Sequence, residues 1–248
     1  MPRVAVVSLN SALLKTRIMQ PYVPQMLRTP SFPPGAPEPV LSLSKDLAFE
    51  TWETTLYPRH EGGLLSRAFG VAVHTLLEEL ARLRTINDWN AARAALVRFK
   101  PRIAAQVRAS GIEPTHAARI ASQALESALN ASRSPQGQWI LSPHAEAASE
   151  LRWAGVVAGR LRTVRVDRIF RAGPAPESEG DDCWWIIDYK TAHADNLDPA
   201  AALPELRKLF ALQLEAYATI LRNLRGNDAP IRAGLYYPRM LLFDWWQL

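Results

Sequence analysis

The residues of this chain best suited to chemistry stand at the end of a short apolar segment. Residues 184–187 are two tryptophans and two isoleucines, and Asp188, Tyr189 and Lys190 follow them. Aromatic and β-branched residues in a short run are typical of a buried strand, whose side chains alternate between two faces. We therefore predict that Asp188 and Lys190 share one face of a strand and that Tyr189 points to the other.

A carboxylate beside an ammonium group, where a core meets solvent, has two interpretations. The carboxylate can bind a hard divalent cation, while the ammonium positions a water molecule or stabilises developing negative charge. The same pair can also be a strand-end ion pair without a chemical role, which is the commoner use of such pairs. Asp188 and Lys190 alone leave both interpretations open.

A second acid lies in a predicted hairpin just upstream of this segment. Residues 150–157 and 160–171 have the composition of strands, and the Ala-Gly pair at residues 158–159 suits the turn between them. Strict alternation along the second strand would put Asp167 and Ile169 on the same face.

A polar loop over residues 172–182 is expected to return the chain antiparallel to this strand, which would bring Asp167 close to Asp188. Two neighbouring carboxylates repel each other unless a cation lies between them. Their oxygen ligands, with at most one histidine, favour Mg²⁺ or Mn²⁺ over Zn²⁺. The alternative is that Asp167 pairs with Arg165 or Arg168 at the surface.

Helical spacing of apolar residues predicts the elements around these strands. His74 lies slightly off the apolar stripe of the first helix, and a lone histidine on a helix is usually a surface residue or a satisfied core residue. Gln213 and Tyr217 share a face of the last helix, where they could donate hydrogen bonds to phosphate, sugar or water, or simply border the core. The predicted helices span residues 64–83, 88–110 with a break or kink at Pro101, 114–132 and 199–225. A loop is predicted over residues 133–137, and residues 231–237 and 241–246 are predicted to form a closing hairpin.

Composition limits the classes of protein to which the chain can belong. Its 248 residues suffice for a real core, and no apolar run approaches the roughly 18 residues of a membrane helix. The single Cys183 excludes an internal disulfide and any zinc or iron–sulfur site that needs several thiolates of this chain. The net charge of +5, carried mostly by arginine, fits a polyanionic partner. Without a convincing signal peptide or membrane segment, we expect a cytoplasmic protein.

The chain divides into a proline-rich part and a part with regular patterns. Residues 1–48 are crowded with prolines, which oppose helix and central strand alike, so we interpret them as an extended arm or linker. Residues 49–248 are expected to form one domain, with a helical block over 60–132 and a core over 140–248 that carries the chemistry.

Four motifs, in order along the chain, resemble those of the RecB-like branch of the PD-(D/E)XK nuclease superfamily. In particular they resemble the nuclease module at the C-terminus of UvrD/AddA-type helicase–nucleases. Each motif is weak singly, but their order and predicted setting over about residues 60–240 are specific together. The motifs are Arg67-Ala-Phe-Gly-Val-Ala-Val-His74, Val166-Asp167-Arg168-Ile169, Ile187-Asp188-Tyr189-Lys190-Thr191 and Gln213-Leu-Glu-Ala-Tyr217.

The resemblance implies a role for each matching residue. The metal ligands would be His74, Asp167, Asp188 and the backbone carbonyl of Tyr189. Lys190 would position or activate the attacking water and stabilise charge on the phosphate. Gln213 and Tyr217 would match the QxxxY motif of the family, near DNA and the active site. Glu150 would match an acidic position ahead of the first catalytic strand.

The resemblance also implies a fold, an activity and partners. The fold would be α/β, with a mixed sheet flanked by helices as in restriction endonucleases and an N-terminal helical block. The activity would be Mg²⁺- or Mn²⁺-dependent hydrolysis of DNA, as an exonuclease on single-stranded ends in recombinational repair. Many relatives also bind an iron–sulfur cluster through four cysteines, which this chain departs from because it has only Cys183. The partner would be a UvrD-like helicase, either a separate polypeptide or the protein from which this module is detached.

A further departure from the family and two other functions accompany this hypothesis. Val164 stands where the family often has glycine, which bears on the local backbone and not on the chemistry. A non-catalytic DNA-binding or assembly module could retain the same fold. A restriction-type endonuclease shares the acid–acid–lysine core, although the His74 helix and the Gln213/Tyr217 helix favour the RecB-like branch.

Overall fold

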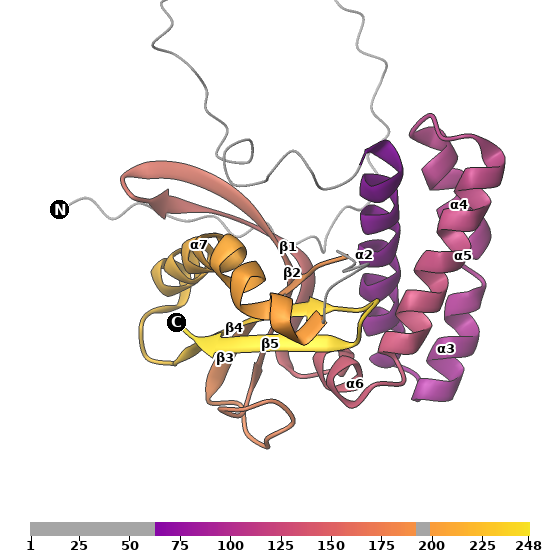
Figure 1. Ribbon diagram of the computed structural model, residues 1–248. Helices are drawn as coiled ribbons and strands as arrows, with labels where there is room; N and C mark the ends of the chain where they lie inside the picture. Colours follow the sequence, from indigo (N-terminus) through magenta and orange to yellow (C-terminus); the bar gives the residue numbers. More distant parts are fainter. Residues whose placement is uncertain (1–62, 192–198) are drawn as a thin grey trace, which may run out of the picture. The chain divides into compact units, whose positions relative to one another are not determined.

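The computed structural model of the chain describes residues 63–191 and 199–248, so the arm expected over residues 1–48 lies outside the described residues. A mixed sheet of five strands has helices packed on both of its faces (Figure 1). The helices are α2 (Leu64–Arg84), α3 (Trp89–Val97), α4 (Lys100–Ala109), α5 (Pro114–Ala131), α6 (Pro135–Leu141) and α7 (Pro199–Arg225). The strands are β1 (Ala145–Val157), β2 (Arg160–Ala172), β3 (Cys183–Tyr189), β4 (Ile231–Tyr237) and β5 (Leu242–Gln247).

The order of strands across the sheet is the same as their order along the chain, from β1 to β5. Neighbouring strands are antiparallel except β3 and β4, which run parallel. A parallel pair needs a long crossover connection, and the 27-residue helix α7 supplies it. This arrangement confirms the α/β fold, a mixed sheet flanked by helices, that the sequence predicted.

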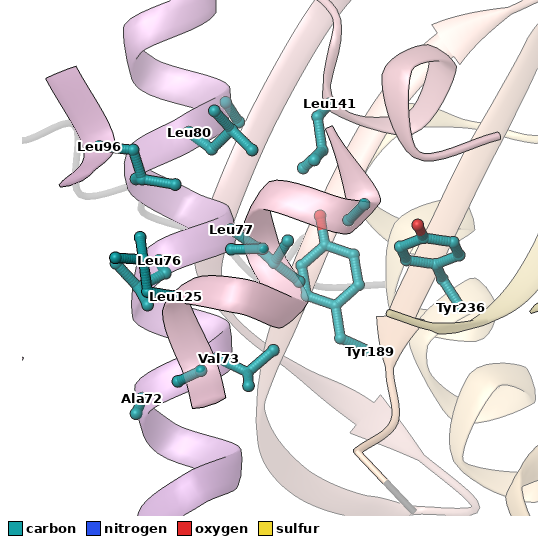
Figure 2. Packing of buried hydrophobic residues seen from close by; sticks show 14 of the residues in the cluster. Ala72, Val73, Leu76, Leu77, Leu80, Leu96, Leu125, Leu141, Tyr189 and Tyr236 are labelled. Atoms are coloured by element: carbon teal, nitrogen blue, oxygen red, sulfur yellow. The ribbon is translucent and has the colours of Figure 1, made fainter. Parts of the chain in front are cut away.

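Two hydrophobic clusters hold the helices against the sheet, one on each face. β3 is buried at every position, and its side chains alternate between the two clusters. Trp185, Ile187 and Tyr189 pack with the helices α2 to α6, whereas Trp184 and Ile186 pack with α7. Figure 2 shows part of the first cluster, where leucines of α2 and the ring of Tyr189 lie together. Burial of both faces explains why the sequence of β3 is a continuous apolar run.

The helices before the sheet follow the predicted spans closely. α2 ends one residue later than predicted, and α5 ends one residue earlier. The helix predicted over residues 88–110 is divided into α3 and α4, and Pro101 lies in the first turn of α4, where its missing N–H is harmless. The predicted break is therefore confirmed. Among the helices of residues 63–191 and 199–248, none combines the length and apolar character needed to cross a membrane.

The loop predicted over residues 133–137 is wrong, because the short helix α6 begins there. Ser134 caps this helix, since its Oγ accepts a hydrogen bond from the Gly137 N–H at 3.1 Å, and Pro135 occupies the first turn. A Cβ atom at Gly137 would collide with the backbone carbonyl of Ala131, so this glycine permits close packing. Serine, proline and glycine, which also favour loops, here begin a helix.

The β1–β2 hairpin turns where the sequence predicted. Ala158 and Gly159 have φ angles of 49° and 74°, and two successive positive angles are what a type I′ turn requires. β1 begins at Ala145 rather than at Glu150. The sequence did not predict these first residues as strand, because alanine and glutamate have little strand propensity. The hairpin is therefore longer than predicted, and Figure 1 shows it lying over α7.

Candidate metal centre

His74 brings an imidazole from α2 to the end of β3. Its Nε2 lies 3.0 Å from the carbonyl oxygen of Tyr189, and because a carbonyl only accepts, Nε2 is the donor. Its Nδ1 lies 3.4 Å from Asp167 Oδ1 and 3.8 Å from Glu150 Oε1. The buried leucines of α2 fix the helix against the sheet, and His74, beside that stripe, faces the acids.

Asp167 lies where the regular alternation of β2 is interrupted. Val166 and Ile169 belong to the same cluster, on the α7 face, although an odd number of positions separates them. Opposite this point on β1, Glu150 has a φ of 53°, which a regular strand does not accommodate. The prediction that Asp167 and Ile169 share a face is therefore wrong. Asp167 reaches His74 of α2, whereas Ile169 packs with α7.

A backbone hydrogen bond fixes the orientation of the Asp167 carboxylate. The ladder between β2 and β3 ends at the pair Arg168 and Ile187. Beyond it, Asp167 Oδ2 accepts a hydrogen bond from the backbone N–H of Tyr189 at 2.7 Å. The side chain thus replaces a strand carbonyl at the end of the ladder, and its second oxygen, Oδ1, is left facing His74.

Asp188 and Lys190 lie on the α7 side of β3. Lys190 Nζ is 2.8 Å from Asp188 Oδ2, so the two side chains share a face. Gln213 of α7 donates from Nε2 to Asp188 Oδ1 at 3.2 Å and to the Tyr217 hydroxyl at 2.6 Å. The Lys190 ammonium also lies 3.7 Å from the ring centre of Phe210, a cation–π contact. Residues of α7 therefore hold both the acid and the amine.

One group of side chains in the described part of the chain has the spacing of a metal site. His74, Glu150 and Asp167 each offer one ligand atom, and these atoms lie within 4.8 Å of one another. Asp188, expected as a ligand, is directed at the amine and amide named above, and the Tyr189 carbonyl contacts His74 while keeping a second lone pair. Oxygen donors with a single imidazole fit a hard divalent cation such as Mg²⁺ or Mn²⁺.

Burial and charge shift the pKa values of the two aspartates in opposite directions. Burial raises the pKa of Asp188, and the charge of Asp167 adds to the rise although Lys190 opposes it. Burial would also raise the pKa of Asp167, but His74 and a backbone N–H hold it below its ordinary value. Burial lowers the pKa of His74, yet Asp167 and Glu150 outweigh this and raise it to about 10. The acids therefore create a strongly negative field at His74 Nδ1, which favours a cation there.

Glu150 is the member of this cluster that the residue pattern alone does not identify. An acid at the start of a predicted strand is usually exposed, and only the family resemblance pointed to this position. In the structure Glu150 faces His74 and also forms an ion pair with Arg165, with 2.6 Å between Oε2 and Nε. Its left-handed backbone turns it toward α2, and periodicity cannot predict such a local deviation.

A mixed sheet with a parallel central pair, and acids, a histidine and a lysine gathered near the end of β3, defines a restriction-endonuclease-like core. Comparison with models of known families matches residues 53–242 to the PD-(D/E)XK nuclease superfamily, and the chain belongs to this superfamily. No curated protein matches the chain. Membership indicates a nuclease that uses a divalent metal, and the donor set of the cluster fits that chemistry.

Proposed function

We propose that the chain is a metal-dependent deoxyribonuclease of the RecB-like branch, which acts as an exonuclease on single-stranded DNA ends beside a UvrD-like helicase in recombinational repair. The nuclease domain would span residues 49–248 and use Mg²⁺ or Mn²⁺. The observation that carries the proposal is that α2, β2 and the end of β3 bring an imidazole, two carboxylates and an amine to one site. That set combines an oxygen-rich cation site with a positive group for the phosphate.

The metal, when bound, would neutralise charge on the scissile phosphate and lower the pKa of an attacking water. His74, Glu150 and Asp167 would hold it, together with Asp188 and the Tyr189 carbonyl as the family implies. The Tyr189 carbonyl, 3.0 Å from His74 Nε2, keeps a proton on that nitrogen, so the metal would bind at Nδ1 in place of the second proton that the acids favour there.

Lys190 would orient the attacking water and stabilise the negative charge that develops on the phosphate. Asp188 Oδ2 at 2.8 Å and the ring of Phe210 restrict the position of its ammonium before a substrate arrives. Gln213 holds the other oxygen of Asp188 at 3.2 Å, so α7 keeps this carboxylate in place. Preorganised charges of this kind contribute to catalysis because they need no rearrangement during the reaction.

A purified-protein assay tests this function. The wild type should degrade single-stranded DNA with Mg²⁺ or Mn²⁺ and stop when EDTA is added. Asp188→Asn and Lys190→Met should each lower the rate by a factor of about 100 or more with the fold retained. Asp182→Asn, which changes an exposed acid of the loop before β3, is the matched control. Wild-type rates in either site variant would refute the assignment, and DNA binding without cleavage would favour the non-catalytic module.

The exonuclease and helicase parts of the proposal have their own tests. Circular single-stranded DNA has no ends, so it should resist degradation under conditions in which linear DNA of the same sequence is consumed. Equal rates on the two substrates would make the protein an endonuclease. A UvrD-like helicase with ATP should accelerate degradation of blunt duplex DNA, and a helicase that leaves this rate unchanged would remove the partner from the proposal.

A further inference from the structure

The β1–β2 hairpin has one face covered by α7 and one face exposed. Leu151, Trp153 and Val157 pack against the α7 cluster, and a Cβ at Gly155 would lie 3.0 Å from Ile220 of α7. The intervening side chains of both strands point away from α7 and are exposed. We call these residues the outer hairpin face, and they are Arg152, Ala154 and Val156 on β1 with Leu161, Thr163 and Arg165 on β2.

The outer hairpin face carries positive charge that the hairpin neutralises only in part. Between residues 151 and 166 there are four arginines and no acid. Arg152 and Arg165 are directly opposite each other in the ladder, and like charges in that position destabilise a hairpin. Arg165 has a partner in Glu150 at 2.6 Å, whereas Arg152 forms no ion pair among residues 63–191 and 199–248. An external polyanion would supply the missing negative charge.

This face begins at the metal centre and leads away from it. Glu150 precedes Arg152 by two residues on β1, and Asp167 follows Arg165 by two residues on β2. At about 3.4 Å per residue, the arginine pair lies about 7 Å along the hairpin from these acids, a distance suited to a phosphate neighbouring the scissile one. The basic pair is therefore placed to hold the strand that is being cut.

The far end of the face is apolar. Val156 and Leu161 are paired across the ladder and are 53% and 76% exposed, about 20 Å along the strand from Glu150. Between them and the arginines stand only the small Ala154 and Thr163. Unpaired bases can contact apolar side chains, whereas a duplex keeps its bases stacked inside and presents phosphates. An arginine pair followed by an apolar pair therefore suits a single strand.

We propose that the outer hairpin face binds single-stranded DNA, with Arg152 and Arg165 on a phosphate beside the cleavage site and Val156 and Leu161 against bases further along. This inference rests on the proposed nuclease function, and it assigns to the hairpin the discrimination between single strands and duplex DNA.

Fluorescence anisotropy with a labelled oligothymidine, in EDTA to prevent cleavage, tests the surface directly. Arg152→Gln should weaken binding about fivefold and reduce the slope of log affinity against log salt by about 0.7, as loss of one phosphate contact predicts. Arg152→Lys, which keeps the positive charge, should restore most of the affinity and most of the salt slope. Leu161→Ser should weaken binding to the single strand several-fold with an unchanged salt slope. Its affinity for a duplex of the same sequence, which we expect to be weaker, should equal that of the wild type.

Two control variants match these substitutions elsewhere on the surface. Arg108→Gln removes an exposed arginine of α4, and Ile86→Ser removes an apolar side chain that is 77% exposed, as Leu161 is at 76%. Both should bind DNA like the wild type, and thermal unfolding should show that all the variants are folded.

The outcomes separate this inference from the proposed function. Wild-type affinity and salt slope in Arg152→Gln and Leu161→Ser, while the wild type cleaves DNA, would overturn the hairpin surface and leave the nuclease. Equal losses for single-stranded and duplex DNA in Leu161→Ser would overturn the base contact. A wild type that neither binds nor cuts DNA would overturn the proposed function itself.

Discussion

Asp167 has two roles that a pair of substitutions can separate. Its Oδ2 accepts the Tyr189 N–H at 2.7 Å, and its Oδ1 faces His74 Nδ1 at 3.4 Å. Asparagine at position 167 keeps an oxygen for the N–H but loses the negative charge. Alanine loses both the acceptor and the charge, so the difference between the two variants reports the backbone hydrogen bond alone.

The structure sets the size of this difference. Tyr189 and Asp167 are both buried, so in Asp167→Ala the N–H at the end of the β2–β3 ladder has no acceptor. A buried donor without a partner costs about 1–3 kcal/mol. We therefore expect the free energy of unfolding of Asp167→Ala to lie about 1–3 kcal/mol below that of Asp167→Asn. Both variants should lose Mn²⁺ binding, because neither supplies a carboxylate to the cluster.

Urea unfolding and calorimetry measure the two quantities separately. The fluorescence of the buried Trp184 and Trp185 follows unfolding in EDTA, where no metal contributes to stability. Titration calorimetry then measures Mn²⁺ binding to the folded variants. Equal free energies of unfolding for the asparagine and alanine variants would refute the structural role. Retained Mn²⁺ affinity in Asp167→Asn would remove this residue from the donor set.

Two further expectations concern buried polar groups that are not proposed to bind the metal. The Tyr189 hydroxyl is buried and has no hydrogen-bond partner among the described residues, whereas that of Tyr236 is 3.3 Å from Ser134 Oγ. In urea unfolding, Tyr189→Phe should therefore keep or raise the free energy of unfolding, and Tyr236→Phe should lower it by about 1 kcal/mol; the reverse order would contradict this assignment. Burial, with the nearby Arg168 charge, lowers the pKa of His144, so the unfolded chain takes up a proton near pH 6.5 that the folded chain binds only at lower pH. Stability should thus fall as the pH drops below about 6.5, and unfolding of His144→Phe over the same pH series should show a smaller fall; an identical fall would exclude His144 as its source.

The sequence predicts the fold best where a local pattern has only one structural meaning. The spacing of apolar residues gives α2 and α7 almost to the residue, and the apolar run gives β3. The parallel pairing of β3 and β4 did not follow from the sequence, because pairing of distant strands leaves no trace in local periodicity. Helix α6 was missed because Ser-Pro-Gln-Gly is equally typical of a loop and of a capped helix start.

The candidate site shows the same division between local and distant information. The period of two along a strand is enough to place Asp188 beside Lys190. The contact of His74 with Tyr189 joins residues 115 positions apart, and only the family resemblance suggested it. The position of Asp167 depends on a slip in the alternation of β2, and periodicity would have turned this acid to the same face as Ile169.

The most direct test of a metal centre at His74, Glu150 and Asp167 is anomalous scattering from a crystal grown with Mn²⁺. We expect one strong peak about 2 Å from His74 Nδ1 and from carboxylate oxygens of both acids. A crystal that binds Mn²⁺ only at exposed acids elsewhere on the surface, with this cluster empty, would contradict the assignment of the site.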